Sequence, residues 1–171
     1  LPILEYRDGK LTSKTVKKIN GKKYAFDDAG RMLTGFVAVN GDSVNVNVDD
    51  DNNNHYDHDK FTREEWINKN LQGFKYFSAD EEKDGAMKTG YQNIELADDT
   101  YQFYFQKNGE AKTQYDSKIK KYTIAGLVLK PTNDDDNNYA AVTVVGDNEP
   151  TAIATDYDDM TDHETYTGDK V

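Results

Sequence analysis

Three stretches of the chain follow one pattern and decide the fold: KKYAFDDAGRMLTGF at residues 22–36, FKYFSADEEKDGAMKTGY at residues 74–91 and YQFYFQKNGEAKTQY at residues 101–115. In each copy an aromatic strand leads to a turn glycine, and a small or Met residue, a Thr and an aromatic residue follow at intervals of two. Glycine reaches the positive φ of tight turns without steric cost. The pattern predicts an antiparallel hairpin in each copy, the second extending to residue 94, with Gly30, Gly85 and Gly109 at or beside the turns.

Further turn signals extend this pattern along the chain. Asp8-Gly9, Asn20-Gly21 and Asn40-Gly41 recur at short intervals, and KIKKYTIAGLVLKP at residues 118–131 is a degraded fourth copy. A single hairpin cannot bury its apolar face, so repeats of twenty-odd residues must stack on their neighbours. The predicted fold is all-β, a solenoid of stacked β-hairpin repeats.

An insertion separates the first two copies. It covers residues 42–72 and includes the polar stretch DDDNNNHYDHD at residues 49–59. Thr62 and Glu65 have the spacing of a capping box, which predicts a short helix beginning near Thr62. Trp66, the only Trp in the chain, is expected on the buried side of that helix.

Metal, cofactor and catalytic sites are not expected. Oxygen ligands alternate from Asp49 as in a calcium loop, but Lys60 stands where Glu is required and Asn54 replaces the necessary Gly. A solvated acidic loop is therefore favoured over a calcium site, which stays open as the alternative. The three histidines lie in polar segments and are expected to be solvated; they are His55, His58 and His163. The chain has no Cys and no G-x-S-x-G motif, and we expect no enzyme activity.

Charge divides the chain into two parts. The net charge is −11, and residues 132–171 contain eleven acidic residues and a single base. We therefore assign residues 1–131 to the repeat array with its insertion, and residues 132–171 to an acidic linker, a partial strand at 139–145 and a tail. Nucleic-acid binding would need clustered Lys or Arg, so it is not expected. No apolar run is long enough for membrane insertion.

The strings GKKYAFDDAGRMLTGF and DGAMKTGY resemble the cell-wall-binding, or choline-binding, repeat family. The longer second copy, GFKYFSADEEKDGAMKTGY, also looks like the repeats in the receptor-binding region of the large glucosylating toxins. The resemblance covers about residues 5–130. It implies hairpins that wind into a solenoid, with ligands in aromatic pockets between neighbouring hairpins. Those ligands are choline of teichoic acid in one branch and glycans in the other.

The resemblance also suggests where a ligand would bind. The aromatic residue after Thr-Gly corresponds to Phe36 in the first copy and Tyr91 in the second, whereas the leading Trp of the family is replaced by Lys23 and Gln102 in the first and third copies. Most repeat aromatics, such as Phe105, are expected in the core. The best candidate pocket is therefore the junction of the second and third copies, with Phe36 as the equivalent position of the first copy; its predicted lining is Phe74, Tyr91, Tyr101 and Tyr115.

The expected function is that of a non-catalytic cell-wall or carbohydrate-binding repeat module of an exported bacterial surface protein. Its expected partner is a cell-wall polymer, either teichoic acid or glycan. The expected location is outside the cell, on the cell surface or in the cell wall. Two alternatives remain open at this point: a passive spacer or scaffold without a ligand, and the binding end of a larger exported enzyme.

Overall fold

A computed structural model describes residues 6–7, 10–48, 53–79, 85–129, 139–145, 149–154 and 164–167, with side chains placed between residues 12 and 129. Within these ranges the strands pair in antiparallel fashion, and helical structure is confined to η1 (His58–Lys60) and α1 (Arg63–Lys69). The all-β class predicted from the sequence is confirmed. The described strands divide into five sheets, and no continuous solenoid sheet joins them, so the solenoid remains a prediction.

The N-terminal sheet contains the first predicted hairpin. In the turn between β4 and β5, Phe26 pairs with Met32, and the Gly30 amide donates to the Asp27 carbonyl at 3.1 Å. Gly30 has a φ of +75°, as its place in the turn requires. The strands of this sheet are β3 (Thr15–Ile19), β4 (Lys22–Phe26), β5 (Met32–Leu33), β7 (Val39–Asn40) and β8 (Ser43–Val44), and a separate small hairpin is formed by β1 (Tyr6–Arg7) and β2 (Lys10–Leu11).

A three-stranded sheet connects the first copy, the insertion and the second copy. Its central strand is β6 (Gly35–Val37), flanked by β9 (His55–Tyr56) and β10 (Lys75–Phe77). The second predicted hairpin starts in β10, because Phe77 bridges to Met87 and the Lys88 amide donates to the Tyr76 carbonyl at 2.8 Å. This hairpin ends near residue 88, so its predicted extension to residue 94 is wrong.

Residues 90–95 belong instead to the third sheet, which has the order β11-β12-β15-β14-β13. The aromatic residue after Thr-Gly begins a new strand that pairs with the next copy rather than folding back on its own. The third predicted hairpin is present, with Phe105 bridged to Ala111 and Gly109 at a φ of +89°. The strands are β11 (Gly90–Glu95), β12 (Thr100–Phe105), β13 (Gln114–Asp116), β14 (Lys121–Ile124) and β15 (Leu127–Val128).

Successive hairpins meet through the same two contacts. The residue two places after the turn glycine donates its amide to the leading residue of the preceding copy: Met87 to the Lys23 carbonyl at 2.9 Å, and Ala111 to the Phe74 carbonyl at 2.8 Å. The side chain at that place also covers the turn glycine of the following copy. Three such contacts occur in order along the chain, Met32 on Gly85, Met87 on Gly109 and Ala111 on Gly126.

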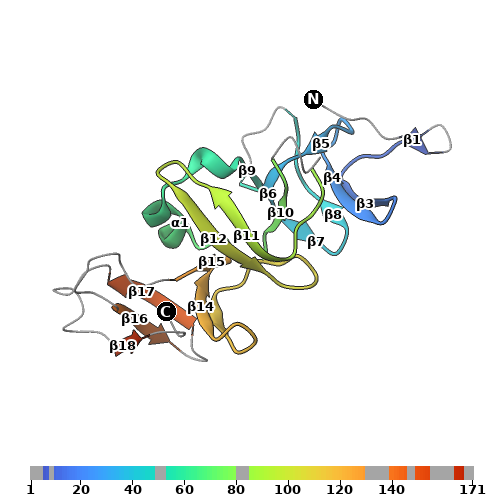
Figure 1. Ribbon diagram of the computed structural model, residues 1–171. Helices are drawn as coiled ribbons and strands as arrows, with labels where there is room; N and C mark the ends of the chain where they lie inside the picture. Colours follow the sequence, from blue (N-terminus) through green and yellow to red (C-terminus); the bar gives the residue numbers. More distant parts are fainter. Residues whose placement is uncertain are drawn as a thin grey trace.

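The insertion carries the predicted helix. Thr62 is its N-cap and forms a complete capping box with Glu65, while Asn70 ends the helix in the left-handed conformation. Trp66 is fully buried, and its indole nitrogen donates to the Ile124 and Ala125 carbonyls. Figure 1 shows α1 beside the β11–β12 hairpin, where it closes one side of the main aromatic core.

The C-terminal strands form a separate sheet in the order β17-β16-β18. The strand predicted at residues 139–145 is confirmed as β16 (Tyr139–Val145). It pairs with β17 (Glu149–Ala154) and β18 (Glu164–Thr167), two strands that the prediction of a partial strand and a tail did not include. β16 is thus the central strand of this sheet, with both edges paired.

Candidate functional site

The predicted pocket residues do not come together as one site. Phe36 is fully buried, and its ring centroid lies 4.3 Å from Trp66 and 5.0 Å from Tyr76. It sits in the central strand of a three-stranded sheet, with α1 packed above it, so it has no surface for a ligand. The aromatic residue after Thr-Gly is therefore part of the core in the first copy, although the same position is exposed in the second copy at Tyr91.

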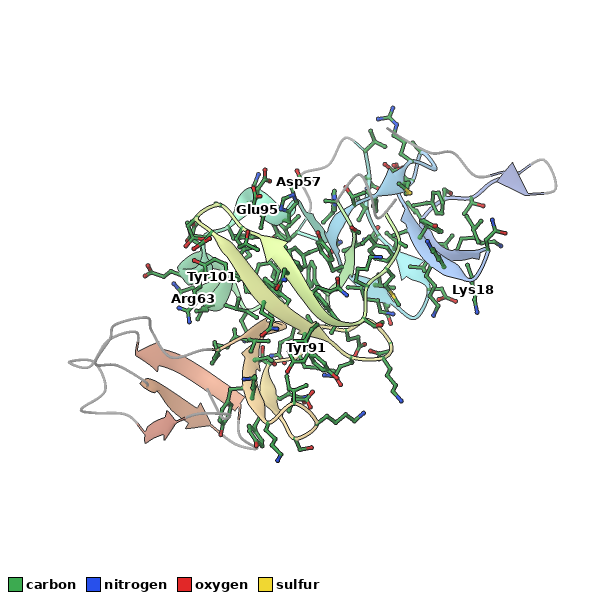
Figure 2. The ribbon with its side chains drawn as sticks, in the orientation of Figure 1. Lys18, Asp57, Arg63, Tyr91, Glu95 and Tyr101 are labelled. Carbon is green, nitrogen blue, oxygen red and sulfur yellow. The ribbon has the colours of Figure 1, made fainter. Side chains whose placement is uncertain are left out.

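Tyr91 and Tyr101 lie on opposite faces of the β11–β12 hairpin. Directly paired residues share a face and faces alternate along a strand. Tyr91 pairs with Tyr104 on the outer face, whereas Tyr101 pairs with Ile94 on the side that faces the core. Figure 2 shows the two labelled tyrosines toward opposite ends of the hairpin, with Tyr101 beside Arg63.

Tyr101 is held in place by polar contacts. Its hydroxyl donates to Asp98 Oδ2 at 2.8 Å, and its ring packs at the margin of the aromatic core. Burial and this hydrogen bond to Asp98 raise the pKa of Tyr101 to about 12. These contacts give Tyr101 a structural role next to the start of α1.

Tyr91 is the largest apolar side chain that the described residues expose. It is 44% exposed, and its ring meets that of Tyr104 edge to face with centroids 5.0 Å apart. Partial burial, followed by the neighbouring Tyr104 and Asp116, raises the pKa of Tyr91. We call the outer face of this hairpin the tyrosine platform, and it consists of Tyr91, Asn93, Gln102 and Tyr104.

Tyr104 was not predicted as a site residue, but the sequence contained a signal for it. Alternation in Tyr101-Gln102-Phe103-Tyr104-Phe105 places Gln102 and Tyr104 on one face, and only the pairing with Tyr91 was missing. Tyr115, the remaining predicted residue, is half-buried and forms a separate ring pair with Tyr122 at 5.0 Å.

Phe74 lies at a different cavity. Only 9% of this residue is exposed, and it forms part of the floor of a groove of about 410 Å³. The groove lies where Gly73 and Phe74 bond to Ala111 of the third copy, facing the β7–β8 hairpin. We call it the amide groove, because its polar lining consists of Asn40, Ser43, Asn45, Asn54, Gln72 and Glu110.

A second cavity, of about 340 Å³, lies between the first hairpin turn and the insertion. Unlike the amide groove it has charged groups of both signs in its lining, which includes Asp27, Arg31, Asp57 and Lys60. The carboxylate of Asp27 shapes the turn by accepting from the Ala29 and Arg31 amides at 2.9 and 2.8 Å. This side chain thus serves the hairpin that the first copy predicts.

The calcium alternative falls partly on residues 49–52, which lie outside the described residues. Among the side chains that are placed, no three His, Asp or Glu residues are grouped so that they could hold a metal ion. The prediction that His55 and His58 are solvated is wrong in part. Their rings form hydrogen bonds with the Thr34 and Glu95 carbonyls and so attach the insertion to the repeats. His163 lies outside the described residues. No helix in the described part of the chain is long and apolar enough to cross a membrane.

No protein-family model and no curated protein sequence matches the chain. Among solved structures, the chain is similar to choline binding protein F from Streptococcus pneumoniae, with 16% identity, 76% of this chain and 41% of that chain covered, and a TM-score of 0.29. A structure of CbpF in complex with ipratropium matches with 17% identity, 75% and 42% coverage, and a TM-score of 0.21. The chain thus spans about two fifths of the length of these proteins. Overlap at these TM-scores carries no argument about the fold or ligand of this chain.

Proposed function

We propose that the chain is a non-catalytic module that binds a polymer of the bacterial cell wall, as part of an exported surface protein. The single observation that carries the proposal is the tyrosine platform. Tyr91 keeps 44% of its surface exposed next to Tyr104, whereas Phe36 at the equivalent position of the first copy is fully buried. An exposed tyrosine beside a half-buried one on the outer face of a hairpin is a suitable contact for a ligand with both apolar and polar groups.

Two components of cell-wall polymers fit this chemistry. A sugar ring can pack its C–H face on Tyr91 while its hydroxyl groups bond to the amides of Asn93 and Gln102 on the same face. The quaternary ammonium of choline can lie over a tyrosine ring within cation–π range. Asp116 is buried and its carboxylate accepts hydrogen bonds from Gln106 and from the Lys118 amide, but it contributes to the raised pKa of Tyr91, and its negative charge would favour a cationic group nearby.

The tyrosine platform offers a ligand only a few side chains to contact. A single site of this kind is expected to bind weakly, because little of the ligand would be removed from water. Strong retention would then require many copies of the module, or many sites on one polymer, acting together. A cell-wall polymer offers such repetition.

The test measures retention of the full chain on purified bacterial cell walls, compared with walls stripped of teichoic acid. Tyr91→Ala should lower retention about 2- to 13-fold, as expected for loss of one aromatic contact of about 0.5–1.5 kcal/mol. Because Tyr91 is 44% exposed but pairs with Tyr104, its removal should lower the free energy of unfolding by about 0.5–1.5 kcal/mol, so the fold of the variant is checked by circular dichroism. Loss of binding to the stripped walls would assign the ligand to teichoic acid, and unchanged binding would assign it to the glycan.

Tyr24→Ala is the matched control, since Tyr24 is a partly exposed tyrosine on the N-terminal sheet. It should leave retention unchanged. If Tyr91→Ala keeps full retention with its fold intact, the platform does not bind the wall. The passive spacer would then be the better account of the chain.

A further inference from the structure

The amide groove has neutral polar walls and an apolar floor. Among its lining residues, Glu110 is the one with a charged side chain. Asn40 and Ser43 come from the β7–β8 hairpin, and Gln72 comes from the turn before β10. The floor is formed by Phe74 together with Ala38 and Val39.

Several polar groups of the groove are available to a ligand. The side-chain amides of Asn40 and Gln72 are exposed and make no hydrogen bond to other described residues. The Asn54 amide nitrogen donates to the Asn45 carbonyl at 2.9 Å, which leaves its oxygen as an acceptor. Glu110 is fixed by an ion pair with Lys112 at 2.9 Å, and this hydrogen bond lowers the pKa of Glu110, so its carboxylate stays ionised and accepts hydrogen bonds.

We propose that the amide groove binds a neutral sugar that carries an N-acetylated amino group. A side-chain amide can donate a hydrogen bond to the carbonyl oxygen of an acetamido group and accept one from its N–H. A sugar that carries only hydroxyl groups does not offer this amide pair. The acetyl methyl group and the sugar C–H face would contact Phe74 and Val39 on the floor. The volume of about 410 Å³ lies in the range of small-molecule sites, roughly 300–1,000 Å³.

Other ligand classes suit the groove less well. An anionic group would find no cationic side chain among the residues that line the groove, since Lys112 outside the lining is already paired with Glu110. A quaternary ammonium needs an accessible ring face, but Phe74 is the one aromatic residue in the lining of the groove and is only 9% exposed. This inference rests on the proposed function, because the sugar would be a component of the cell-wall polymer. The amide groove is nevertheless a site separate from the tyrosine platform.

The experiment follows the backbone and side-chain amide signals of the full chain by NMR during titration with N,N′-diacetylchitobiose. Cellobiose, which has the same linkage but no acetamido group, is titrated in parallel. We expect saturable shifts of the Asn40, Asn54 and Gln72 side-chain signals with the first sugar and at least fivefold weaker binding of the second, as for loss of about one hydrogen bond. Equal binding of both sugars, or no saturable shift at these residues, would overturn the proposal.

Variants separate this site from the platform. Gln72→Ala should weaken diacetylchitobiose binding roughly three- to tenfold. Gln114→Ala, a half-buried glutamine on β13 outside the groove, is the matched control and should leave binding unchanged. Tyr91→Ala should also keep sugar binding in the groove, whatever it does to wall retention. If Gln72→Ala binds the sugar as tightly as the wild type, the groove is not the site.

Discussion

The stacked hairpins and the inserted segment are held by different kinds of contact. Between hairpins the same main-chain bond recurs, from Met87 to Lys23 and from Ala111 to Phe74. The inserted segment uses no recurring contact. Its helix is held by the indole N–H of Trp66, which donates to carbonyls of the fourth copy, and by the Thr113 hydroxyl, which donates to the Asn70 side chain.

This difference shows how a repeat array can accept a long insertion. The hairpins keep their mutual spacing because each contact depends on a turn glycine and the residue two places after it, which the insertion leaves intact. The insertion in turn covers the aromatic face that the gap between the first two copies would otherwise expose. Its stability therefore depends on the hairpins, and the hairpins gain a common core from it.

The largest effect should come from removing the side chain that joins the two regions. Trp66 is fully buried, with ring centroids 4.3 Å from Phe36 and 5.5 Å from Phe103. Trp66→Ala should lower the free energy of unfolding by about 3–5 kcal/mol, the usual range for a buried Trp. Urea unfolding followed by circular dichroism measures this change.

Trp66→Phe is the matched variant for that experiment. It keeps an aromatic ring in the core but removes the indole N–H that bonds to Ile124 and Ala125, so it should be less destabilising than Trp66→Ala. A loss below about 1 kcal/mol for Trp66→Ala would mean that the insertion and the hairpins are energetically independent.

The parts of the fold that local sequence signals determine were predictable, and the parts that depend on contacts between distant segments were not. The turn glycines Gly30, Gly85 and Gly109 were assigned from their spacing, and the capping box of Thr62 was assigned from local sequence. Both signals act over a few residues. The partner of Gly90–Glu95 was missed because strand pairing depends on the neighbouring copy.

The candidate site was less predictable than the fold for the same reason. Tyr91 was correctly expected to be more exposed than Phe105, but the face on which Tyr101 lies follows from register. Phe36 and Tyr91 occupy the same place in the pattern, but Phe36 is covered by Trp66 of the insertion and by aromatic rings of the second and third copies. The amide groove combines side chains from distant segments, such as Asn40 and Gln72, which no sequence spacing relates.

An intermediate effect is expected where the insertion crosses the first copy. Gly35 has a φ of +95°, and a Cβ atom there would lie 2.5 Å from the backbone oxygen of Tyr56 in β9. Gly35→Ala should therefore cost backbone strain of about 1–3 kcal/mol and should also displace β9 from β6. The free energy of unfolding and the amide exchange of residues 55–56 measure the two consequences.

Gly21→Ala is the control that separates backbone strain from the close approach of the new Cβ atom to β9. Its φ is +82°, but a Cβ atom there would have no neighbour within 4 Å, so Gly21→Ala reports the backbone term alone. We expect Gly35→Ala to be clearly more destabilising than Gly21→Ala. Equal losses would show that β9 is not held tightly against β6 at this point.

The smallest effect concerns the contact that repeats between hairpins. A Cβ atom on Gly109 would lie 2.6 Å from the sulfur of Met87, and Gly109 has a φ of +89°. Gly109→Ala should cost about 1–2 kcal/mol from its backbone conformation, plus the shift of the methionine. Met87→Ala removes the sulfur atom with which the new Cβ atom would clash. The double variant Gly109→Ala/Met87→Ala should therefore be less destabilised than the sum of the two single variants by about 0.5–1 kcal/mol, measured from urea unfolding.

Met87→Ala combined with Gly41→Ala is the control, since Gly41 also has a positive φ, +62°, but no neighbour near its Cβ position. That pair should be additive, and a coupling as large as that of Met87 with Gly109 would mean that the stacking contact between consecutive hairpins is not specific to the turn glycine.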